Sequence, residues 1–333
     1  MPGAEESMSS DAVMDGSDLH PFYAGPPTFM NIPHRTDATG AKVAILGCPF
    51  DCGTHPFRVG ARQGPSSIRE QSALLFRFHP EFADLDVPSA LGAVDCGDVR
   101  LVPSRAEDSF AAIEEAAFRI VTTGAVPIGL GGDGSVSLPL VRAASRVHPG
   151  LAVLHIDSHT DTFRVDERYP IDAATQFTHA AREQRISTSS SYHLGLRGTL
   201  PQARVFEYGR EMGFNLVTLA EFFQRGPRAV VQEVRANIGD KPLYLSWDMD
   251  VFDPSCAPGV CTPVWGGLNA REGIDLIRSL SGLNIVAADI NTVSPAQDVN
   301  GLTAFLAATM VYEMFLLVLA RDAMKAAEAP APQ

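Results

Sequence analysis

Paired cysteines are absent from this sequence. Its 333 residues include five cysteines, which form no CxxC pair and no regular framework. They are Cys48, Cys52, Cys96, Cys256 and Cys261. This scatter indicates free thiols in a reducing compartment and not a small fold held together by disulfides.

Basic charge is also scarce. The chain has 26 Lys and Arg against 39 Asp and Glu, which gives a formal net charge of −13. That balance argues against nucleic acid and anionic membranes as partners, and it is compatible with small cationic molecules. The N-terminal segment MPGAEESMSSDAVMDGSD is acidic where a secretory signal would be basic and then apolar. We therefore expect a cytoplasmic protein.

One long apolar run occurs near the C-terminus. Residues 302–320 read LTAFLAATMVYEMFLLVLA, with Glu313 in the middle and no aromatic belt or basic flank. A membrane span would normally carry those flanks and would avoid a central carboxylate. We expect this segment to be a buried helix of a soluble protein.

Length and composition predict one large folded domain. Hydrophobic residues make up 45% and charged residues 20%, which is ordinary for a globular protein with a sizeable core. Residues 1–38 are rich in Gly, Pro, Ser and acidic residues, and we expect a flexible arm there. A single domain is expected over 39–325, followed by a disordered tail at 326–333.

Short apolar segments alternate with helical patterns along that domain. The segment 110–123 places Phe110, Ile113, Ala117 and Ile120 on one helical face, and 271–280 repeats the pattern. The expected strands are Val43–Cys48, Val126–Leu130, Ala152–Ile156, His193–Leu196, Leu243–Trp247 and Ile285–Ile290. Continuous apolar strands between helices predict an α/β fold with a parallel sheet covered on both faces.

Ligand-type side chains follow two of these strands. The stretch LHIDSHTDTF places Asp157, His159 and Asp161 at every second residue, and LYLSWDMDVFDP does the same with Asp248 and Asp250. Residues two apart in extended backbone share a face, and parallel strands deliver functional groups at their carboxyl ends. Four carboxylates gathered there would repel one another unless protons or cations neutralise them, so we expect metal.

The donor types narrow the choice of metal. Carboxylate and imidazole without thiolate favour Mn²⁺, Ni²⁺ or a similar ion over structural zinc, and paired ions of this kind activate water for attack on carbon. The alternative is that these aspartates only cap helices and loops, which the repeated spacing disfavours. By strand alternation we expect His155 to point away from the metals, and we expect His179 and His193 outside the site.

The motifs resemble those of the arginase/agmatinase (ureohydrolase) family. The matching stretches are LGCPFDCGTHPFRVGARQGPSSIRE (46–70), VDCGDV (94–99), DSHTD, GLRG (195–198), SWDMDVFDPSCAPG and CTPVWGGL. The resemblance covers roughly residues 40–320. It implies a three-layer α/β/α sandwich, assembly as trimers or hexamers, and metal-dependent hydrolysis at a guanidinium carbon.

The resemblance also assigns roles to the ligand-type residues. It implies that Asp157 and Asp248 bridge two metals and that His159 and Asp250 complete one position. Asp161 would help to hold the other metal. If the chain is active, Asp157, His159 and Asp248 would be the residues at the centre of catalysis.

The sequence departs from the family pattern at three positions. The family's GGDH is Gly131-Gly132-Asp133-Gly134 here, so a histidine ligand is replaced by Gly134. Ala173 stands where the family has a histidine that shuttles a proton or grips the substrate, and Val264 stands for a carboxylate that faces the guanidinium. We expect Trp265, next to Val264, to form an apolar wall or to fill an unused pocket, and Trp247 to belong to the core.

These departures leave two hypotheses open. The first is a self-sufficient amidinohydrolase with an altered metal centre and an unusual guanidino substrate. The second is a non-catalytic or weakly catalytic subunit that stabilises an active paralogous subunit, with metal partial or absent in this chain. A chain of this second kind resembles the accessory subunit of heteromeric, nickel-dependent ureohydrolases that act on biguanides. This resemblance implies an assembly that cleaves metformin to guanylurea and dimethylamine.

Overall fold

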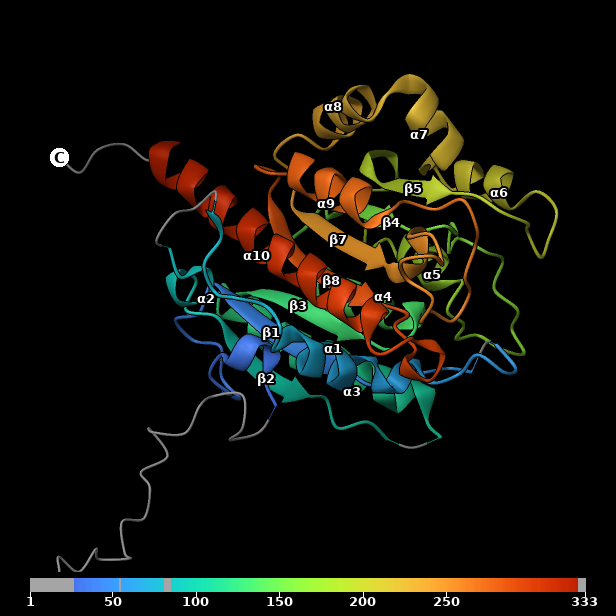
Figure 1. Ribbon diagram of the computed structural model, residues 1–333. Coiled ribbons are helices and arrows are strands. Elements are labelled where there is room, and N and C mark those ends of the chain that lie inside the picture. The colour runs from blue at the N-terminus through green and yellow to red at the C-terminus, as the bar shows by residue number, and fades with distance from the viewer. Residues whose placement is uncertain (1–26, 54, 81–84, 103, 329–333) are drawn as a thin grey trace, which may run out of the picture.

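A single parallel sheet organises the chain. The computed structural model describes residues 27–328 except 54, 81–84 and 103. Its eight strands lie in the order β2-β1-β3-β8-β7-β4-β5-β6, and every pairing between them is parallel (Figure 1). The strands are β1 (Val43–Cys48), β2 (Val94–Asp98), β3 (Val126–Gly131), β4 (Ala152–Ile156), β5 (Tyr192–Leu196), β6 (Asn215–Thr218), β7 (Leu243–Asp248) and β8 (Ile285–Asn291).

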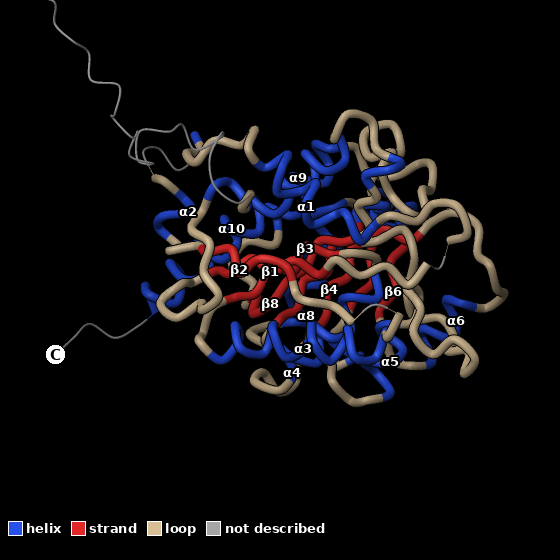
Figure 2. The backbone as a smooth tube through the Cα atoms, turned by 90° about the horizontal axis from the view of Figure 1, so that it is seen from below, coloured by secondary structure: helices blue, strands red, loops and turns tan. Residues whose placement is uncertain are grey.

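Helices cover both faces of the sheet, which makes three layers (Figure 2). One core cluster joins the sheet to α1 (Gly64–Ser72), α2 (Val87–Ala90), α7 (Leu219–Arg225), α8 (Pro227–Ile238), α9 (Ala270–Ser279) and α10 (Leu302–Glu328). The other cluster joins the opposite face to α3 (Ala106–Thr122), α4 (Ser137–Ser145) and α5 (Gln176–Arg182). A further helix, α6 (Val205–Glu211), lies against β6. The predicted three-layer α/β class is confirmed.

The six predicted strands are confirmed to within one residue at either end. They are buried at every position, which is why their sequences read as continuous apolar runs. The two strands that sequence reasoning missed, β2 and β6, lie at the edges of the sheet and are partly exposed. Polar sequences such as VDCGD and NLVT carry little strand signal because only one side of each needs to be apolar.

The folded part begins before residue 39. Residues 1–26, most of the expected N-terminal arm, lie outside the described residues, as do 329–333 of the expected tail. Phe29 and Met30, which we expected in the arm, are buried in the core. The ring of Phe29 lies 5.6 Å from that of Phe315 on α10. The five cysteines are free thiols.

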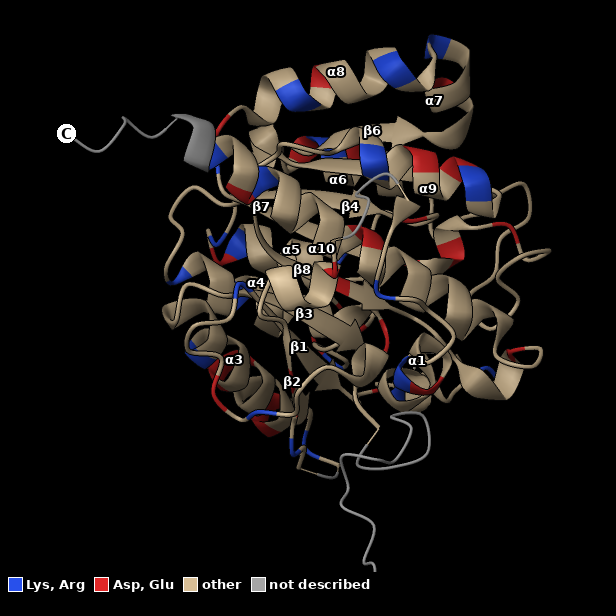
Figure 3. Ribbon diagram, turned by 60° about the vertical axis from the view of Figure 1, so that its left-hand side comes forward, with Lys and Arg blue, Asp and Glu red and all other residues tan. Residues whose placement is uncertain are grey.

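The apolar C-terminal run forms the core helix α10. By length and composition Leu302–Lys325 could cross a membrane, but 78% of its most apolar window is buried inside the protein. It lies along the sheet next to α1 and α9, whereas charged residues follow the outer helices α8 and α9 (Figure 3). The expectation of a buried helix is therefore confirmed, and its central Glu313 is buried as well.

Glu313 is neutralised by an arginine from the neighbouring helix. Arg278 of α9 donates from Nε to Oε2 at 2.9 Å and from Nη2 to Oε1 at 2.7 Å. The same Nη2 lies 2.9 Å from His79 Nε2. This bidentate pair ties α9 to α10 across an otherwise apolar contact.

Loss of this arginine should destabilise the fold. Arg278→Met leaves the Glu313 carboxylate buried without its cation, so the free energy of unfolding should fall by about 2 kcal/mol. Urea unfolding followed by circular dichroism measures this. Arg271→Met on the same helix is the control, because its pair with Asp275 is 3.9 Å long and exposed. Equal effects of the two substitutions would contradict the expectation.

Candidate metal centre

The ligand-type residues meet where β4 and β7 end side by side. Ile156, the last residue of β4, pairs with Trp247 of β7, so Asp157 and Asp248 leave the sheet at the same level. Trp247 is fully buried and packs against Phe252, as expected of a core residue. The predicted convergence brings together Asp157, His159 and Asp250, whose ligand atoms lie within 4.8 Å of one another.

The two carboxylates of this first group are buried, and His159 is partly exposed. His159 Nδ1 lies 3.1 Å from Asp250 Oδ2 and 3.4 Å from Asp157 Oδ1. Ser158 donates from its hydroxyl to Asp250 Oδ1 at 2.7 Å and from its backbone amide at 3.2 Å. These bonds hold the Asp250 carboxylate in place and leave its other oxygen facing His159.

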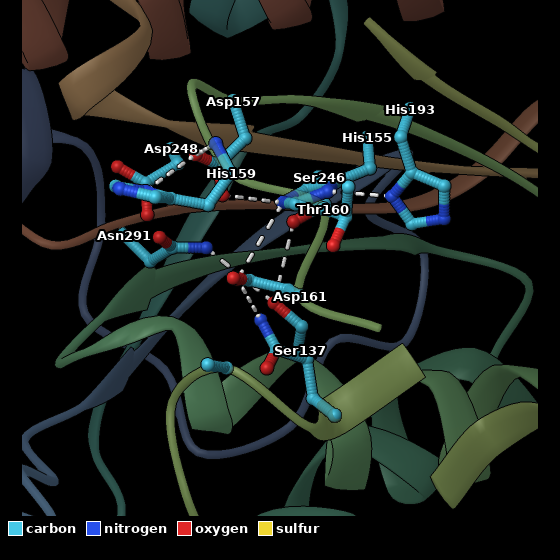
Figure 4. A network of polar contacts seen from close by, with 12 residues as sticks. Ser137, His155, Asp157, His159, Thr160, Asp161, His193, Ser246, Asp248 and Asn291 are labelled. Atoms are coloured by element: carbon cyan, nitrogen blue, oxygen red, sulfur yellow. Dashed lines mark hydrogen bonds and ion pairs between the residues drawn. The ribbon is translucent and has the colours of Figure 1, made fainter. Parts of the chain in front are cut away.

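His155 belongs to the same centre, so the expectation that it points away was wrong. Residues 155 and 157 are two apart and share one face of β4. His155 Nε2 lies 2.9 Å from Asp157 Oδ2 and 3.9 Å from Asp161 Oδ2 (Figure 4). These three residues form a second group that could hold a metal ion. His193, paired with His155 across β4 and β5, contacts it through the two Nδ1 atoms at 2.9 Å.

His179 lies outside the centre, as expected. Its Nε2 contacts the carbonyl oxygen of Pro170 at 2.6 Å.

Asp248 lies beside these groups without joining either of them among the described residues. Its Oδ1 accepts the backbone amide of Asp250 at 2.7 Å and the hydroxyl of Thr292. Thr292 follows β8 directly and has a left-handed backbone with φ 65°. Sequence reasoning missed this residue, although a polar NT after a third buried strand obeys the same rule for strand ends.

Gly134 has no side chain and so offers no donor atom to the carboxylate cluster. Gly134 begins a short 3₁₀ turn after β3, and the neighbouring carboxylate of Asp133 is engaged by the amides of Cys52 at 2.6 Å and Ser135 at 3.1 Å. The carboxylate of Asp161 accepts a hydrogen bond from the side-chain amide of Gln176. Sequence reasoning missed Gln176 because it lies 15 residues after Asp161, outside the two strand-end segments.

The centre forms the floor of a cavity of about 360 Å³. Carboxylates and an imidazole line the floor: Asp133, His159, Asp161, Asp248 and Asp250. Apolar side chains line part of the wall: Phe163, Ala173, Ala174, Leu200 and Pro201. Asp51, His55 and Arg58 line it as well. The cavity therefore combines several carboxylates with an apolar stretch of wall, which suits a cation that carries apolar groups.

Of the three altered positions, Gly134, Ala173 and Val264, only Ala173 is among the described residues that line this cavity. Trp265, next to Val264, does not line it either. Val264 lies against Gly198, where an added Cβ would be 2.5 Å from its Cγ1, and its carbonyl oxygen accepts Arg197 Nη2 at 2.8 Å. Trp265 is 76% exposed, so it neither forms the expected wall nor fills a pocket.

Burial dominates the electrostatics of the cluster. It raises the pKa of Asp161, Asp248 and Asp250, and the charge of Asp157 adds to the effect. Burial also acts to raise the pKa of Asp157, but the two adjacent imidazoles outweigh it and hold that pKa well below its usual value. For His159, burial acts to lower the pKa, yet Asp250 and Asp157 raise it well above the ordinary value. Protons thus take the role that a cation would fill.

The first group, Asp157, His159 and Asp250, fits a divalent ion. Asp157 Oδ2 is buried and, within the described part of the chain, receives no aligned hydrogen bond, although His155 Nε2 is close to it. Together Asp157, His159 and Asp250 offer two carboxylates and an imidazole, which is a donor set for Mn²⁺ or Ni²⁺.

Fold and site together define a three-layer α/β protein with an acidic centre suited to a divalent cation. The chain belongs to the arginase family, whose profile matches residues 41–317. Guanidinopropionase of Pseudomonas aeruginosa is 36% identical over 328 residues, covering 96% of this chain and 100% of the relative.

Solved structures agree with this assignment. The proclavaminate amidino hydrolase from Streptomyces clavuligerus is similar with a TM-score of 0.85 and 33% identity, covering 91% of this chain and 100% of that one. Trypanosoma cruzi formiminoglutamase with Mn²⁺ has a TM-score of 0.78 and 27% identity, covering 88% and 98%. The family predicted from the motifs is therefore confirmed.

Removing the Asp161 charge should stabilise the metal-free protein. Its raised pKa means that ionisation opposes folding. This penalty is absent below the ordinary pKa of 3.8, grows as the pH rises from there to the raised pKa, and is constant above it. Asp161→Asn should raise the free energy of unfolding by about 1 kcal/mol at pH 7 and change little near pH 3.8. The asparagine oxygen can still accept the Gln176 amide.

Chemical denaturation in the presence of a chelator, at both pH values, measures the effect. Asp166→Asn is the control, because Asp166 is exposed and Arg168 lowers its pKa to about 2. If Asp161→Asn instead has a lower free energy of unfolding at pH 7, the ionised Asp161 carboxylate does not destabilise the fold.

Proposed function

We propose that this chain is an accessory subunit of a heteromeric, metal-dependent amidinohydrolase and works beside a paralogous subunit with a complete site. The unequal ligand set carries this proposal. Asp157, His159 and Asp250 form one equipped position, whereas Gly134 supplies no donor to the other. A chain with half of a two-metal centre keeps the fold and the assembly surfaces but has little means of catalysis on its own.

The exposed tryptophan supports a partner subunit. Trp265 is 76% exposed in the loop that follows the Asp248–Asp250 segment. A large aromatic side chain left in water is typical of a surface that becomes buried in a protein–protein contact. By family resemblance the assembly is a trimer or hexamer, with the paralogous subunit as the neighbour.

The cavity and the relatives support the substrate class. Guanidinopropionase and the amidino hydrolase are named for guanidino and amidino compounds. Here the acidic floor would attract such a cation, while Phe163, Leu200 and Pro201 suit N-alkyl groups. A biguanide fits this description, and metformin, cleaved to guanylurea and dimethylamine, is the substrate we propose for the assembly.

The side chains define what the retained metal position would do. Asp157, His159 and Asp250 would hold Mn²⁺ or Ni²⁺, and such an ion supplies a Lewis acid that makes water nucleophilic near pH 7. Ser158 keeps Asp250 oriented through its 2.7 Å hydrogen bond, and His155 stands behind Asp157. Manganese in the Trypanosoma cruzi relative supports one of these metals, while the biguanide assignment favours nickel.

A second candidate function is a self-sufficient amidinohydrolase with an altered metal centre. The equipped position favours it, because three ligands within 4.8 Å of one another are enough to hold one ion. Its substrate would be an unusual guanidino compound that needs no carboxylate at position 264.

Expression of the chain alone and together with the paralogous ureohydrolase separates the two functions. We expect dimethylamine release from metformin, measured by mass spectrometry, to be roughly 100-fold faster for the co-expressed assembly than for this chain alone. A panel of guanidino compounds should give the same contrast. As a control, the matching aspartate of the paralogue, changed to asparagine, should abolish that activity. Turnover by this chain alone that Asp248→Asn abolishes would establish the second function instead.

A further inference from the structure

Gly134 is not required by the backbone. It lies in a 3₁₀ turn, and its φ is not among the positive values that favour glycine. What limits this position is its surroundings. A Cβ added to Gly134 would lie 3.0 Å from Gln176 Nε2, 3.1 Å from the carbonyl oxygen of Ala173 and 3.2 Å from Asp161 Oδ2. A larger side chain here would therefore have to displace the Gln176 amide.

Gln176 occupies the space that such a side chain would use. It is the first residue of α5, it is 1% exposed, and its Nε2 donates to Asp161 Oδ2. Its Oε1 is buried and has no hydrogen-bond partner within the described part of the chain. A buried amide that satisfies only one of its two ends is costly, so a compensating role is expected for the satisfied end.

That role is to supply positive character to Asp161. This carboxylate is 5% exposed and is held by a left-handed backbone with φ 51°, which is uncommon for a residue other than glycine. The nearest imidazole nitrogen, on His155, is 3.9 Å from the oxygen that accepts the amide. An amide N–H directed at a carboxylate is the interaction that a cation at the same place would replace.

We propose that Gln176 and Gly134 form a matched pair that closes the second metal position, with the Gln176 amide standing in for the ion. The chain then holds one divalent ion, at Asp157, His159 and Asp250. The inference rests on the proposed function for the presence of that ion. It adds that the Gln176 side chain fills the second position, which therefore both lacks a ligand and has no room for an ion.

The test counts metal ions in the full-length chain. Protein is dialysed against MnCl₂ or NiCl₂, freed of excess metal by gel filtration and measured by inductively coupled plasma mass spectrometry, with circular dichroism to verify folding. Wild type, Gly134→His and Gln176→Ala should each hold one ion per chain. Gly134→His still has the Gln176 amide in the second position, and Gln176→Ala still lacks a histidine ligand at residue 134. The double variant Gly134→His/Gln176→Ala should hold two.

The outcomes are decisive in both directions. Two ions in the wild type would show that the second position admits an ion although Gln176 is present, and no ion would remove the first position; either result overturns the inference. A folded double variant with one ion also overturns it. If the double variant does not fold, the isosteric Gln176→Glu decides, because a second carboxylate beside Asp161 should admit a second ion.

Metal content and turnover fail independently. One ion together with turnover by the chain alone would end the accessory function but leave this inference standing. Two ions in a chain that is inactive alone would overturn this inference but leave the accessory function standing.

Discussion

The structure depends on how it neutralises carboxylates that a parallel sheet buries together. The ends of β4 and β7 deliver Asp157, Asp248 and Asp250 to one point, and Asp161 follows from the same loop. Burial raises the pKa of most of these groups, so an uncompensated charge among them opposes folding. Each polar neighbour of the cluster neutralises a buried carboxylate or donates a hydrogen bond to it.

The groups that neutralise the carboxylates differ between the two sides of the cluster. On one side the imidazole of His159 lies between two carboxylates, as a ligand and proton carrier would. On the other side the Gln176 amide donates to Asp161, and Gly134 lies against both groups. The family relationship explains why the frame is shared with guanidino hydrolases, whereas this asymmetry is the basis for the accessory function proposed for the chain.

The frame around the centre is conventional and firmly packed. Two core clusters hold the helices on the two faces of the sheet, and α10 adds a long apolar helix whose buried carboxylate, Glu313, is paired with Arg278. Alternation of apolar strands and helices is enough to predict such a frame, because a buried parallel strand must be apolar on both sides. The edge strands β2 and β6 escaped prediction because they are not under that requirement.

The sequence by itself determined the fold class, the family and the meeting of the two aspartate-rich segments, since strand periodicity and spacing act locally along the chain. Only the tertiary structure showed that Gln176 from α5 faces Asp161, that Thr292 after β8 supports Asp248, and that Trp265 stands in solvent. The first two contacts connect residues that are 15 and 44 residues apart in the sequence, and the exposure of Trp265 depends on the direction of its loop. Spacing along a chain carries no information about such contacts, because the turns between elements decide which side chains meet.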